Sequence, residues 1–463
     1  MAVTIEEARL VELRALLDRR LIEPHQETYD EARRVWNGMI DRRPALIVRC
    51  HGASDVLAAL RFARENGLPV AVRGGGHNVA GNAVCDDGIV VDLSPMQGVR
   101  VDPQARTARA EGGVTWGRFD RETQAFGLAT TGGLISTTGI GGFTLGGGIG
   151  WLVRKYGLTC DNLLSADVIA LDGSFVKASA TENADLFWAL RGGGGNFGVA
   201  TSFEYRLHPV GPIILGGVTF YTADKAPKVL HFFREYVERA PDELTSIVVF
   251  VTAPPAPFIP AHLHGAPLVG IAVCYAGPIE QGQSVVAPLK SFEPPDVDLI
   301  GPMPYIALQG MLDAMAAPGL QNYWKSETIG PLTDDAIVVL IAKGAGMPSP
   351  MTHIDVHHMG GAVAKIDADA TAFNQRNARF IVNIVSTWTD AGQNNAQIEW
   401  TRGVWEALRP FSTGGAYLNF LGDEGEDRVR AAYGEAKYQR LAAIKRRYDP
   451  TNALRFNQNI KPA

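Results

Sequence analysis

Three glycine-rich segments hold the residues whose types and spacing could do chemistry. They are residues 73–78 (Arg-Gly-Gly-Gly-His-Asn), residues 139–150, with seven glycines in twelve positions, and residues 193–198. Successive glycines let the backbone approach a ligand closely and turn its N–H groups inward, which suits a pyrophosphate. One cluster alone would more simply be a set of turns. Three clusters within about 125 residues favour a long anionic ligand.

A dinucleotide-binding fold of the Rossmann type does not explain these glycines. Residues 193–198 match the spacing GxGxxG, but the sequence predicts a helix before them (182–190) and a strand after them (199–207). A Rossmann fingerprint follows a strand and opens a helix, which is the reverse order. We therefore reject that fold.

Histidines in two parts of the sequence are further candidates for functional residues. His77 follows the first glycine cluster and is a loop residue, a core histidine or a functional nucleophile, because imidazole is nucleophilic near neutral pH. On residues 353–358 (His-Ile-Asp-Val-His-His), strand alternation puts His353, Asp355 and His357 on one face. The two outer histidines would be about 13 Å apart, which disfavours a metal site. Asp355 and His357 are instead candidate acid–base groups.

The elements that must position these residues change character near Pro209. Up to residue 208 short strands and helices alternate with glycine clusters, as in the predicted helix 54–66 with Gly67 as its cap. From 209 to 415 the pattern predicts one large, mostly antiparallel sheet with helices on one face, and a final helix over 426–447. The expected strands are 217–221, 246–252, 268–275, 336–342, 353–366 and 380–388, and the expected helices are 226–239 and 279–291.

Composition excludes several classes of protein. The 463 residues are 46% hydrophobic and 20% charged, which argues for buried cores and against disorder. With 43 Lys+Arg against 49 Asp+Glu the net charge is -6, so we expect no nucleic-acid partner. We find no apolar run that would span a membrane and no signal peptide, and four cysteines far apart without a CxxC pair. We expect a cytoplasmic protein without a membrane partner.

Five segments together resemble a known family. They are residues 73–78, 132–150, 154–162, 186–198 and 448–459. They are similar to the FAD-linked oxidases of the vanillyl-alcohol oxidase superfamily, and the berberine bridge enzyme-like branch fits best. The resemblance implies an α+β fold: a two-part FAD-binding domain over 1–208 (its PCMH-type part about 40–208), a substrate-binding domain over 209–415, and a C-terminal segment over 416–463 that returns to the FAD domain.

The resemblance implies that FAD is bound covalently. In the family the histidine at the position of His77 carries the flavin through its 8α-methyl carbon. Many relatives add a second bond from a cysteine, but Ile135 stands there, and Cys160 is too far downstream, so we expect a single attachment. The expected FAD-binding residues are Arg73, Gly74, Gly75, Gly76, His77, Asn78, Gly132, Thr137, Thr138, Gly141, Gly142, Gly146, Gly147, Gly198, Val199 and Asn457.

The resemblance also indicates which residues face the substrate. Asn383 stands where relatives have Glu or Gln, and Phe420 where several have a catalytic tyrosine, so two familiar bases are absent. The remaining candidates are Tyr417 and Tyr323, the latter activated by Lys325, since a phenol with pKa near ~10 needs a neighbouring cation. Aromatic packing explains Tyr323 equally well. Asn383, Asp355 and His357 complete the predicted catalytic set.

These expectations combine into one functional hypothesis with two alternatives. The hypothesis is an FAD-dependent oxidase that removes hydride from a C–H bond of a small alcohol, sugar, phenolic or secondary metabolite. Electrons would pass to O2 to give H2O2, with Ser136, Thr137 and Thr138 beside the flavin face, in a monomer or homodimer. The first alternative is a flavin-dependent tailoring oxygenase or dehydrogenase. The second is a non-catalytic flavin protein that sequesters a hydrophobic compound.

Overall fold

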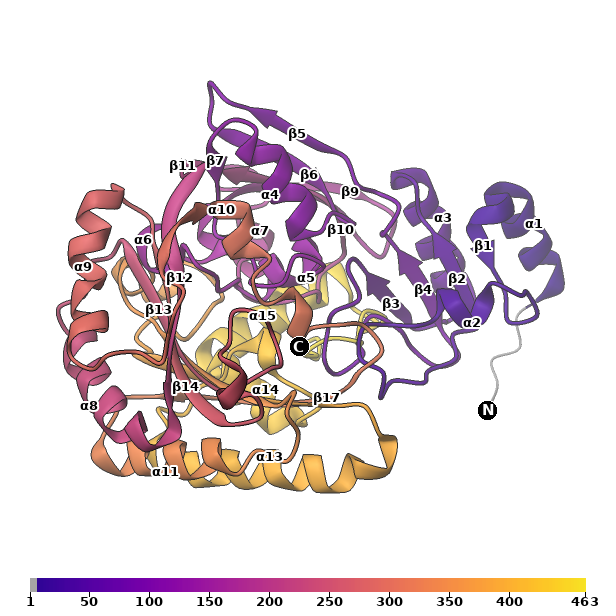
Figure 1. The fold of residues 1–463 in the computed structure, drawn as a ribbon. Helices are drawn as coiled ribbons and strands as arrows, with labels where there is room; N and C mark the ends of the chain where they lie inside the picture. Colours follow the sequence, from indigo (N-terminus) through magenta and orange to yellow (C-terminus); the bar gives the residue numbers. More distant parts are fainter. Residues whose placement is uncertain (1–5) are drawn as a thin grey trace.

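The computed structural model describes residues 6–463, and its first sheet has four strands (Figure 1). The order is β1-β2-β4-β3, with β2, β4 and β3 parallel and β1 antiparallel to β2. The core on one face joins α1 and α3, and Tyr29 of α2 packs on the other. The bounds are α1 (Glu7–Leu17), β1 (Leu21–Ile22), α2 (Tyr29–Ala32), β2 (Leu46–Arg49), α3 (Ala53–Glu65), β3 (Val70–Arg73) and β4 (Ile89–Asp92). The predicted helix cap is confirmed, since Gly67 has a φ of +65°.

A second sheet of five antiparallel strands follows, in the order β5-β6-β10-β8-β9. The two sheets and their helices make up the glycine-rich part of the molecule (residues 6–208). Its remaining elements are β5 (Val99–Asp102), β6 (Thr107–Glu111), α4 (Trp116–Gln124), β7 (Leu128–Ala129), α5 (Ile140–Leu145), α6 (Val153–Tyr156), β8 (Leu163–Ile169), β9 (Phe175–Ser179), α7 (Ala184–Leu190) and β10 (Val199–Arg206). As predicted, residues 193–198 lie between a helix and a strand.

The large sheet has eight strands in the order β15-β12-β14-β13-β18-β19-β17, with β16 also paired to β12. All its pairs are antiparallel. The strands are β12 (Ile213–Thr222), β13 (Leu244–Thr252), β14 (Pro267–Tyr275), β15 (Val297–Asp298), β16 (Gly301–Pro304), β17 (Gln321–Ile329), β18 (His353–His358) and β19 (Phe380–Trp388); the short β11 (His208–Pro209) pairs with β7. The α+β fold expected from the sequence is confirmed.

Helices cover only one face of the large sheet. Figure 1 shows α8 (Ala226–Val237), α9 (Ile279–Ser291), α11 (Asp334–Ala345) and α13 (Asn394–Leu408) on the side away from the glycine-rich part, where they share a core with the sheet. The opposite face meets the glycine-rich part, since Trp151 and Leu152 pack with Val218 and Ile247. The smaller helices are α10 (Tyr305–Gln309) and α12 (Ala362–Lys365).

The C-terminal segment (residues 416–463) returns to the glycine-rich part. Leu441 of α15 and Tyr433 of α14 lie in one hydrophobic core with Trp116 of α4 and Phe203 of β10, a strand of the second sheet. The predicted single helix over 426–447 is two helices, α14 (Glu426–Tyr433) and α15 (Glu435–Tyr448). Gly434 separates them with a φ of +74°, a left-handed conformation that a continuous helix does not contain.

Other predicted elements need correction. The strand predicted over 336–342 is part of α11, because the hydroxyl of Thr333 accepts a hydrogen bond from Ala336 N as an N-cap. The strand predicted over 353–366 ends at His358, before glycines 360 and 361. Strand β17 and helix α13 were not predicted. Within residues 6–463, no helix is both long and apolar enough to cross a membrane.

Candidate functional site

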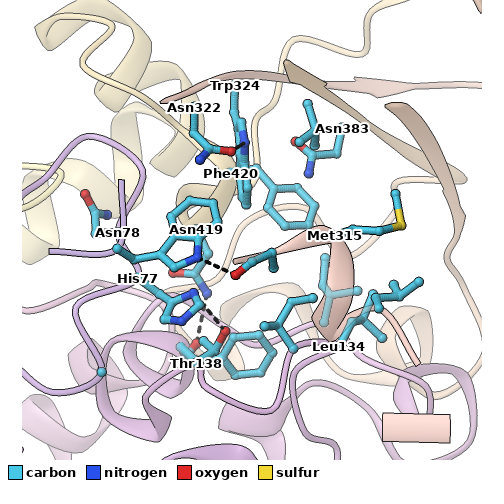
Figure 2. A pocket seen from close by; sticks show the side chains of 18 of the residues that line it. His77, Asn78, Leu134, Thr138, Met315, Asn322, Trp324, Asn383, Asn419 and Phe420 are labelled. Carbon is cyan, nitrogen blue, oxygen red and sulfur yellow. Dashed lines mark hydrogen bonds between the residues drawn. The ribbon is translucent and has the colours of Figure 1, made fainter. Parts of the chain in front are cut away.

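A cavity of about 900 Å³ lies between the glycine-rich part and the large sheet. All three glycine clusters line it on one side, and inward-facing residues of β12, β13, β17, β18 and β19 line it on the other. Figure 2 shows His77 and Thr138 across the cavity from Asn322, Trp324 and Asn383. The two halves of the sequence therefore meet at one site.

The glycine side of the cavity depends on a backbone-to-backbone contact. A Cβ on Gly75 would overlap the backbone nitrogen of Gly139, and a Cβ on Gly139 would overlap that of Gly75. Only glycine at both positions lets the first cluster lie directly on the second. Gly142 and Gly195 differ, because a Cβ there would meet no protein atom within 4 Å in the described chain, and both line the cavity. Their missing side chains leave room for a ligand.

His77 is held in one orientation at the edge of this cavity. Trp36 stacks on its ring with centroids 5.1 Å apart and planes 19° apart. Nε2 lies 2.8 Å from the hydroxyl of Thr137, and Nδ1 lies 3.4 Å from the hydroxyl of Thr138. Burial lowers the pKa of His77 to about 4, so the imidazole is neutral at physiological pH. A neutral imidazole keeps a lone pair on one ring nitrogen.

A second hollow of about 530 Å³ also borders His77, and it shares Trp36 and residues 74–76 with the main cavity described above. We call it the outer hollow; Thr137, Arg73 and Asp92 are among its lining residues. Nη2 of Arg73 lies 2.6 Å from Asp92 Oδ2, and Nη1 donates to the carbonyl oxygen of Ala32. Arg73 therefore anchors the glycine loop from outside the main cavity. The sequence predicted that Arg73 contacts the cofactor directly, but Arg73 does not line that cavity.

Most of the predicted FAD-binding residues line the main cavity, and five do not. Those that do are Gly74, Gly75, Gly76, His77, Asn78, Thr138, Gly141, Gly142, Gly146, Gly198 and Asn457. Thr137 lies with Arg73 in the outer hollow. Gly132 packs against Trp116, Gly147 against Phe373, and Val199 within the core of the first sheet, so packing explains these three positions.

The large sheet supplies the polar groups opposite the glycines. As strand alternation predicted, His353, Asp355 and His357 of β18 all line the cavity, and Asp355 pairs with Asn383 of β19 in the sheet register. His353 Nε2 lies 3.5 Å from Asp355 Oδ2. Asn383 Oδ1 and His357 Nε2 are buried without a hydrogen-bond partner among the described residues. Burial lowers the pKa of His357, which keeps its ring neutral.

Tyr323 and Lys325 do not face the cavity, which corrects their predicted role as an activated base. Their strand, β17, is pleated so that Asn322 and Trp324 point into the cavity and the odd-numbered neighbours point toward α13. Tyr323 Oη accepts a hydrogen bond from Arg402 Nε at 3.1 Å. Lys325 Nζ forms a buried ion pair with Glu424 at 2.6 Å.

Tyr417 does not line the main cavity either, so it is not placed to act as a catalytic base. It is fully buried, and its hydroxyl oxygen accepts hydrogen bonds from the backbone N–H groups of Gly148 (3.0 Å) and Ile149 (3.1 Å) and from Asn419 Nδ2 (2.7 Å). Burial raises the pKa of this phenol well above its usual range. Tyr417 therefore organises the second glycine cluster, while Asn419, two residues on, lines the cavity.

Some residues that hold the two sides of the cavity together were not predicted from the sequence. Asp313 accepts hydrogen bonds from the backbone N–H (2.8 Å) and the hydroxyl (2.6 Å) of Ser136. Ser136 is thus fixed from the large-sheet side, and of the three residues 136–138 only Thr138 lines the main cavity. Trp36, which stacks on His77, donates from Nε1 to Ala316 O at 2.8 Å. No local sequence signal marks Trp36 or Asp313, because each acts through a distant partner.

The residues present fit the FAD that the resemblance implies. Gly142 and Gly195 leave space that a Cβ would fill, and Asn457 presents a buried Oδ1 that has no hydrogen-bond partner in residues 6–463. His77 is neutral and borders the same space. A long flat ligand with a pyrophosphate matches a cavity lined by glycine backbone at one end and by apolar side chains elsewhere. The part of the chain that the structure describes contains no cluster of three His, Cys, Asp or Glu residues that could hold a metal ion.

Comparison with known proteins agrees with this geometry. Residues 44–179 match the model of the FAD binding domain, and residues 416–461 match the model described as berberine and berberine like. An FAD-linked oxidoreductase of Dictyostelium discoideum is 34% identical over 433 residues, covering 92% of this chain and 91% of the relative. The chain belongs to the berberine bridge enzyme-like family of FAD-linked oxidoreductases.

Other relatives extend the similarity over nearly the whole chain. (R)-6-hydroxynicotine oxidase of Paenarthrobacter nicotinovorans is 31% identical over 460 residues, covering 96% of both chains. The crystal structure of 6-hydroxy-D-nicotine oxidase from Arthrobacter nicotinovorans has a TM-score of 0.86 at 28% identity, covering 96% of this chain and 98% of that one. The xylooligosaccharide oxidase of Myceliophthora thermophila, at 21% identity and a TM-score of 0.85, shares the fold. This berberine bridge enzyme-like protein is an FAD-linked oxidoreductase that acts on a small molecule.

The open space at Gly142 gives a direct test of the FAD site. We expect Gly142→Ala to fold normally, because its Cβ meets no atom of the described chain, but to lose FAD, because the methyl group projects into the cavity. The measurement is the ratio of flavin absorbance to protein absorbance, together with the circular dichroism spectrum. Gly403→Ala is the matched control, since Gly403 lies in α13 with similar open space but outside the cavity. Full flavin content in Gly142→Ala would contradict this placement of FAD.

Proposed function

We propose that this enzyme is an oxidase that removes hydride from a C–H bond of a small organic substrate and passes the electrons to O2, giving H2O2. The observation that carries the proposal is the single cavity in which the glycine clusters face Asp355, His357 and Asn383 across a largely apolar space. Bound FAD supplies the hydride acceptor and the reaction with O2. The protein supplies the binding site, the orientation of the substrate and the proton acceptor.

We further propose that FAD is bonded to His77 through Nδ1 and to no other residue. Thr137 engages Nε2 on the side of the outer hollow, and Thr138 lies beside Nδ1 on the side of the main cavity. If the Nε2–H donates to the Thr137 hydroxyl, the lone pair of Nδ1 is directed toward the cavity. Ile135 lines the cavity where relatives carry a second attachment site, and Cys160 is fully buried in another core.

The proton acceptor in this proposal comes from β18 in place of the two tyrosines. Asp355 is half-buried in the cavity wall, with His353 Nε2 3.5 Å away to share or relay a proton. Asn383 Oδ1 can accept one hydrogen bond from the substrate, because its own partners are lacking within the described residues. This cluster also favours catalysis over the alternative of a protein that only sequesters a hydrophobic compound, for which buried polar groups would be a cost.

The covalent bond is tested by acid precipitation. We expect the unmutated protein to give a yellow pellet and one flavin-bearing peptide containing His77, whereas His77→Ala should release its flavin on denaturation. Because burial holds the pKa of His77 near 4, the nucleophilic neutral ring should persist as pH falls from 8 to about 5.5. Covalent attachment to added FAD should therefore be nearly independent of pH over that range. A colourless pellet from the unmutated protein would refute the bond.

The orientation of His77 is tested at Thr137. We expect Thr137→Val, which keeps the shape but loses the hydroxyl, to slow covalent attachment by roughly 10- to 100-fold, in line with the loss of one hydrogen bond to a reacting group. Thr137→Ser should attach FAD at close to the normal rate. The readout is flavin fluorescence of the denatured protein against time after FAD is added. Equal rates for the valine and serine variants would show that the hydroxyl is not needed.

Reaction with oxygen is tested at Thr138, which lines the main cavity. We expect the reduced enzyme to reoxidise in air much faster than free flavin and to release hydrogen peroxide. Thr138→Leu should slow reoxidation and leave reduction unchanged, because its bulk blocks the approach of O2, whereas Thr138→Val should have little steric effect. Stopped-flow mixing of reduced enzyme with oxygenated buffer measures both. Reoxidation no faster than that of free flavin would indicate a dehydrogenase that uses another acceptor.

A further inference from the structure

A buried ion pair lies behind the wall of the main cavity, outside the cavity itself. Lys325 Nζ and Glu424 Oε2 are 2.6 Å apart, and only 9% and 6% of the two side chains are exposed. A buried ion pair seldom stabilises a fold more than an apolar pair of similar size would, and its best-supported role is to select one arrangement of the chain. For this pair, the arrangement concerned is that of the residues that precede Glu424.

Residues 417–424, which we call the strap, connect the glycine-rich part to the large sheet. At one end, the hydroxyl of Tyr417 accepts hydrogen bonds from two backbone N–H groups of the second glycine cluster. At the other end, Glu424 is paired with Lys325 of β17. Within residues 6–463, no backbone–backbone hydrogen bond joins the strap to β17. The attachment of the strap to this strand is therefore made by side chains.

The middle of the strap lines the main cavity. A Cβ on Gly146 would lie 2.1 Å from Asn419 Oδ1, so the strap lies directly on the second glycine cluster. The ring of Phe420 makes a T-shaped contact with Trp324, with centroids 6.2 Å apart, and lies 5.6 Å from the ring of His357. Figure 2 shows Asn419 and Phe420 among the side chains that line the cavity. The strap thus forms one wall of the space that FAD fits.

A second ion pair and a tryptophan hold the first pair in place. Lys325 Nζ lies 4.2 Å from the ring centroid of Trp405 on α13, and Glu327 Oε2 accepts a hydrogen bond from Trp405 Nε1 at 3.0 Å. Arg428 Nε lies 3.7 Å from Glu424 Oε2, and Arg428 Nη2 lies 3.1 Å from Glu327 Oε2. Two cations and two carboxylates therefore form one group beside this tryptophan, and their charges balance. Such a connected polar group favours a single geometry of its members.

We propose that Lys325 and Glu424 are a positioning pair, which holds the strap against β17 so that Asn419 and Phe420 keep the cavity closed over bound FAD. Neither member of the pair lines the cavity, so both act through the strap. Without the pair, the strap remains bound to the glycine-rich part through Tyr417 but loses its attachment to the large sheet. The inference requires FAD in the main cavity and does not depend on the proposed oxidase function.

A double variant separates positioning from stability. Removal of one partner alone would leave a buried charge unpaired and would destabilise the whole protein. Lys325→Met combined with Glu424→Gln removes both charges at once and keeps the volume of the two side chains, while Arg428 keeps its partner Glu327. We therefore expect the double variant to fold, to bind FAD and to melt at a temperature close to that of the unmutated holoenzyme.

The opposite edge of the large sheet offers a matched control. Lys290 Nζ of α9 lies 2.7 Å from Asp298 Oδ2 of β15, the strand at the other end of the sheet order from β17. Neither residue lines the main cavity. Lys290→Met combined with Asp298→Asn therefore removes one ion pair of the same sheet without affecting the strap.

Two measurements on the holoenzymes test the proposal. In hydrogen exchange followed by mass spectrometry, we expect peptides from residues 417–424 to exchange at least about 10-fold faster in the double variant, and peptides from β12, β13 and β14 to exchange at the normal rate, because the opening is local. The visible absorption bands of the bound flavin should shift toward those of flavin in water, since the open strap admits water to the cavity. The control variant should match the unmutated holoenzyme in both measurements.

Each contrary outcome rejects a defined part of the proposal. Unchanged exchange of residues 417–424 in the double variant would show that the pair does not position the strap. Faster exchange throughout the large sheet, with a lower melting temperature, would show a general structural role, and so would faster strap exchange in the control variant. Faster strap exchange with an unchanged flavin spectrum would refute closure over FAD. An enzyme that passes its electrons to an acceptor other than O2 would give the same results, so failure of the oxidase function is distinguishable.

Discussion

The backbone contact between Gly75 and Gly139 is the constraint on which the site depends. At this point the loop after β3 and the loop before α5 touch without any side chain between them. The contact brings His77, Thr137 and Thr138 into one cluster, although they belong to different elements. A methyl group at either glycine would overlap the backbone of the other loop, so the two loops would have to separate, and His77 lies only two residues from Gly75. The position of the His77 imidazole therefore depends on the absence of two side chains.

The pleat of the large sheet has a comparable influence on the opposite side. Successive residues of a strand point to opposite faces, so β17 sends Asn322 and Trp324 to the cavity and Tyr323 to the helices. The same alternation presents Asp355 of β18 to the cavity and buries Val356 in the core shared with the helices. The chemistry of the cavity is thus set by register, since a slip of one residue would exchange the two faces.

The sequence predicted the glycine side of the site better than the substrate side. Clusters such as residues 74–78 and 139–146 are local patterns whose conformational freedom has a local cause, and they line the cavity as expected. The roles predicted for Tyr323 and Tyr417 depended on which way a side chain points across a sheet, which requires the exact strand bounds. Strand β17 was not predicted at all. Without it, the orientation of Tyr323 could not be worked out.

Contacts between distant segments were beyond local reasoning. The link between Asp313 and Ser136 joins residues 177 positions apart, and nothing in either segment marks it. The strand predicted over 336–342 failed for a related reason. A short run of Ile, Val and Leu suits a buried strand as well as a helix, and the capping hydroxyl of Thr333 favours the helix. In contrast, the large antiparallel sheet was predicted from the change in pattern near Pro209, because that pattern extends over many residues.

The return of the C-terminal segment to the glycine-rich part sets an order of events during synthesis. Phe456, Asn457 and Gln458 line the same cavity as residues 74–78, yet the ribosome makes them only after the whole large sheet. The core that contains Trp116 also stays incomplete until α15 is added. The nascent chain must therefore keep an unfinished N-terminal half in a soluble state while the large sheet emerges. A cavity with all of its lining residues therefore exists only once the C-terminal segment has been made, so complete binding of FAD is a late step.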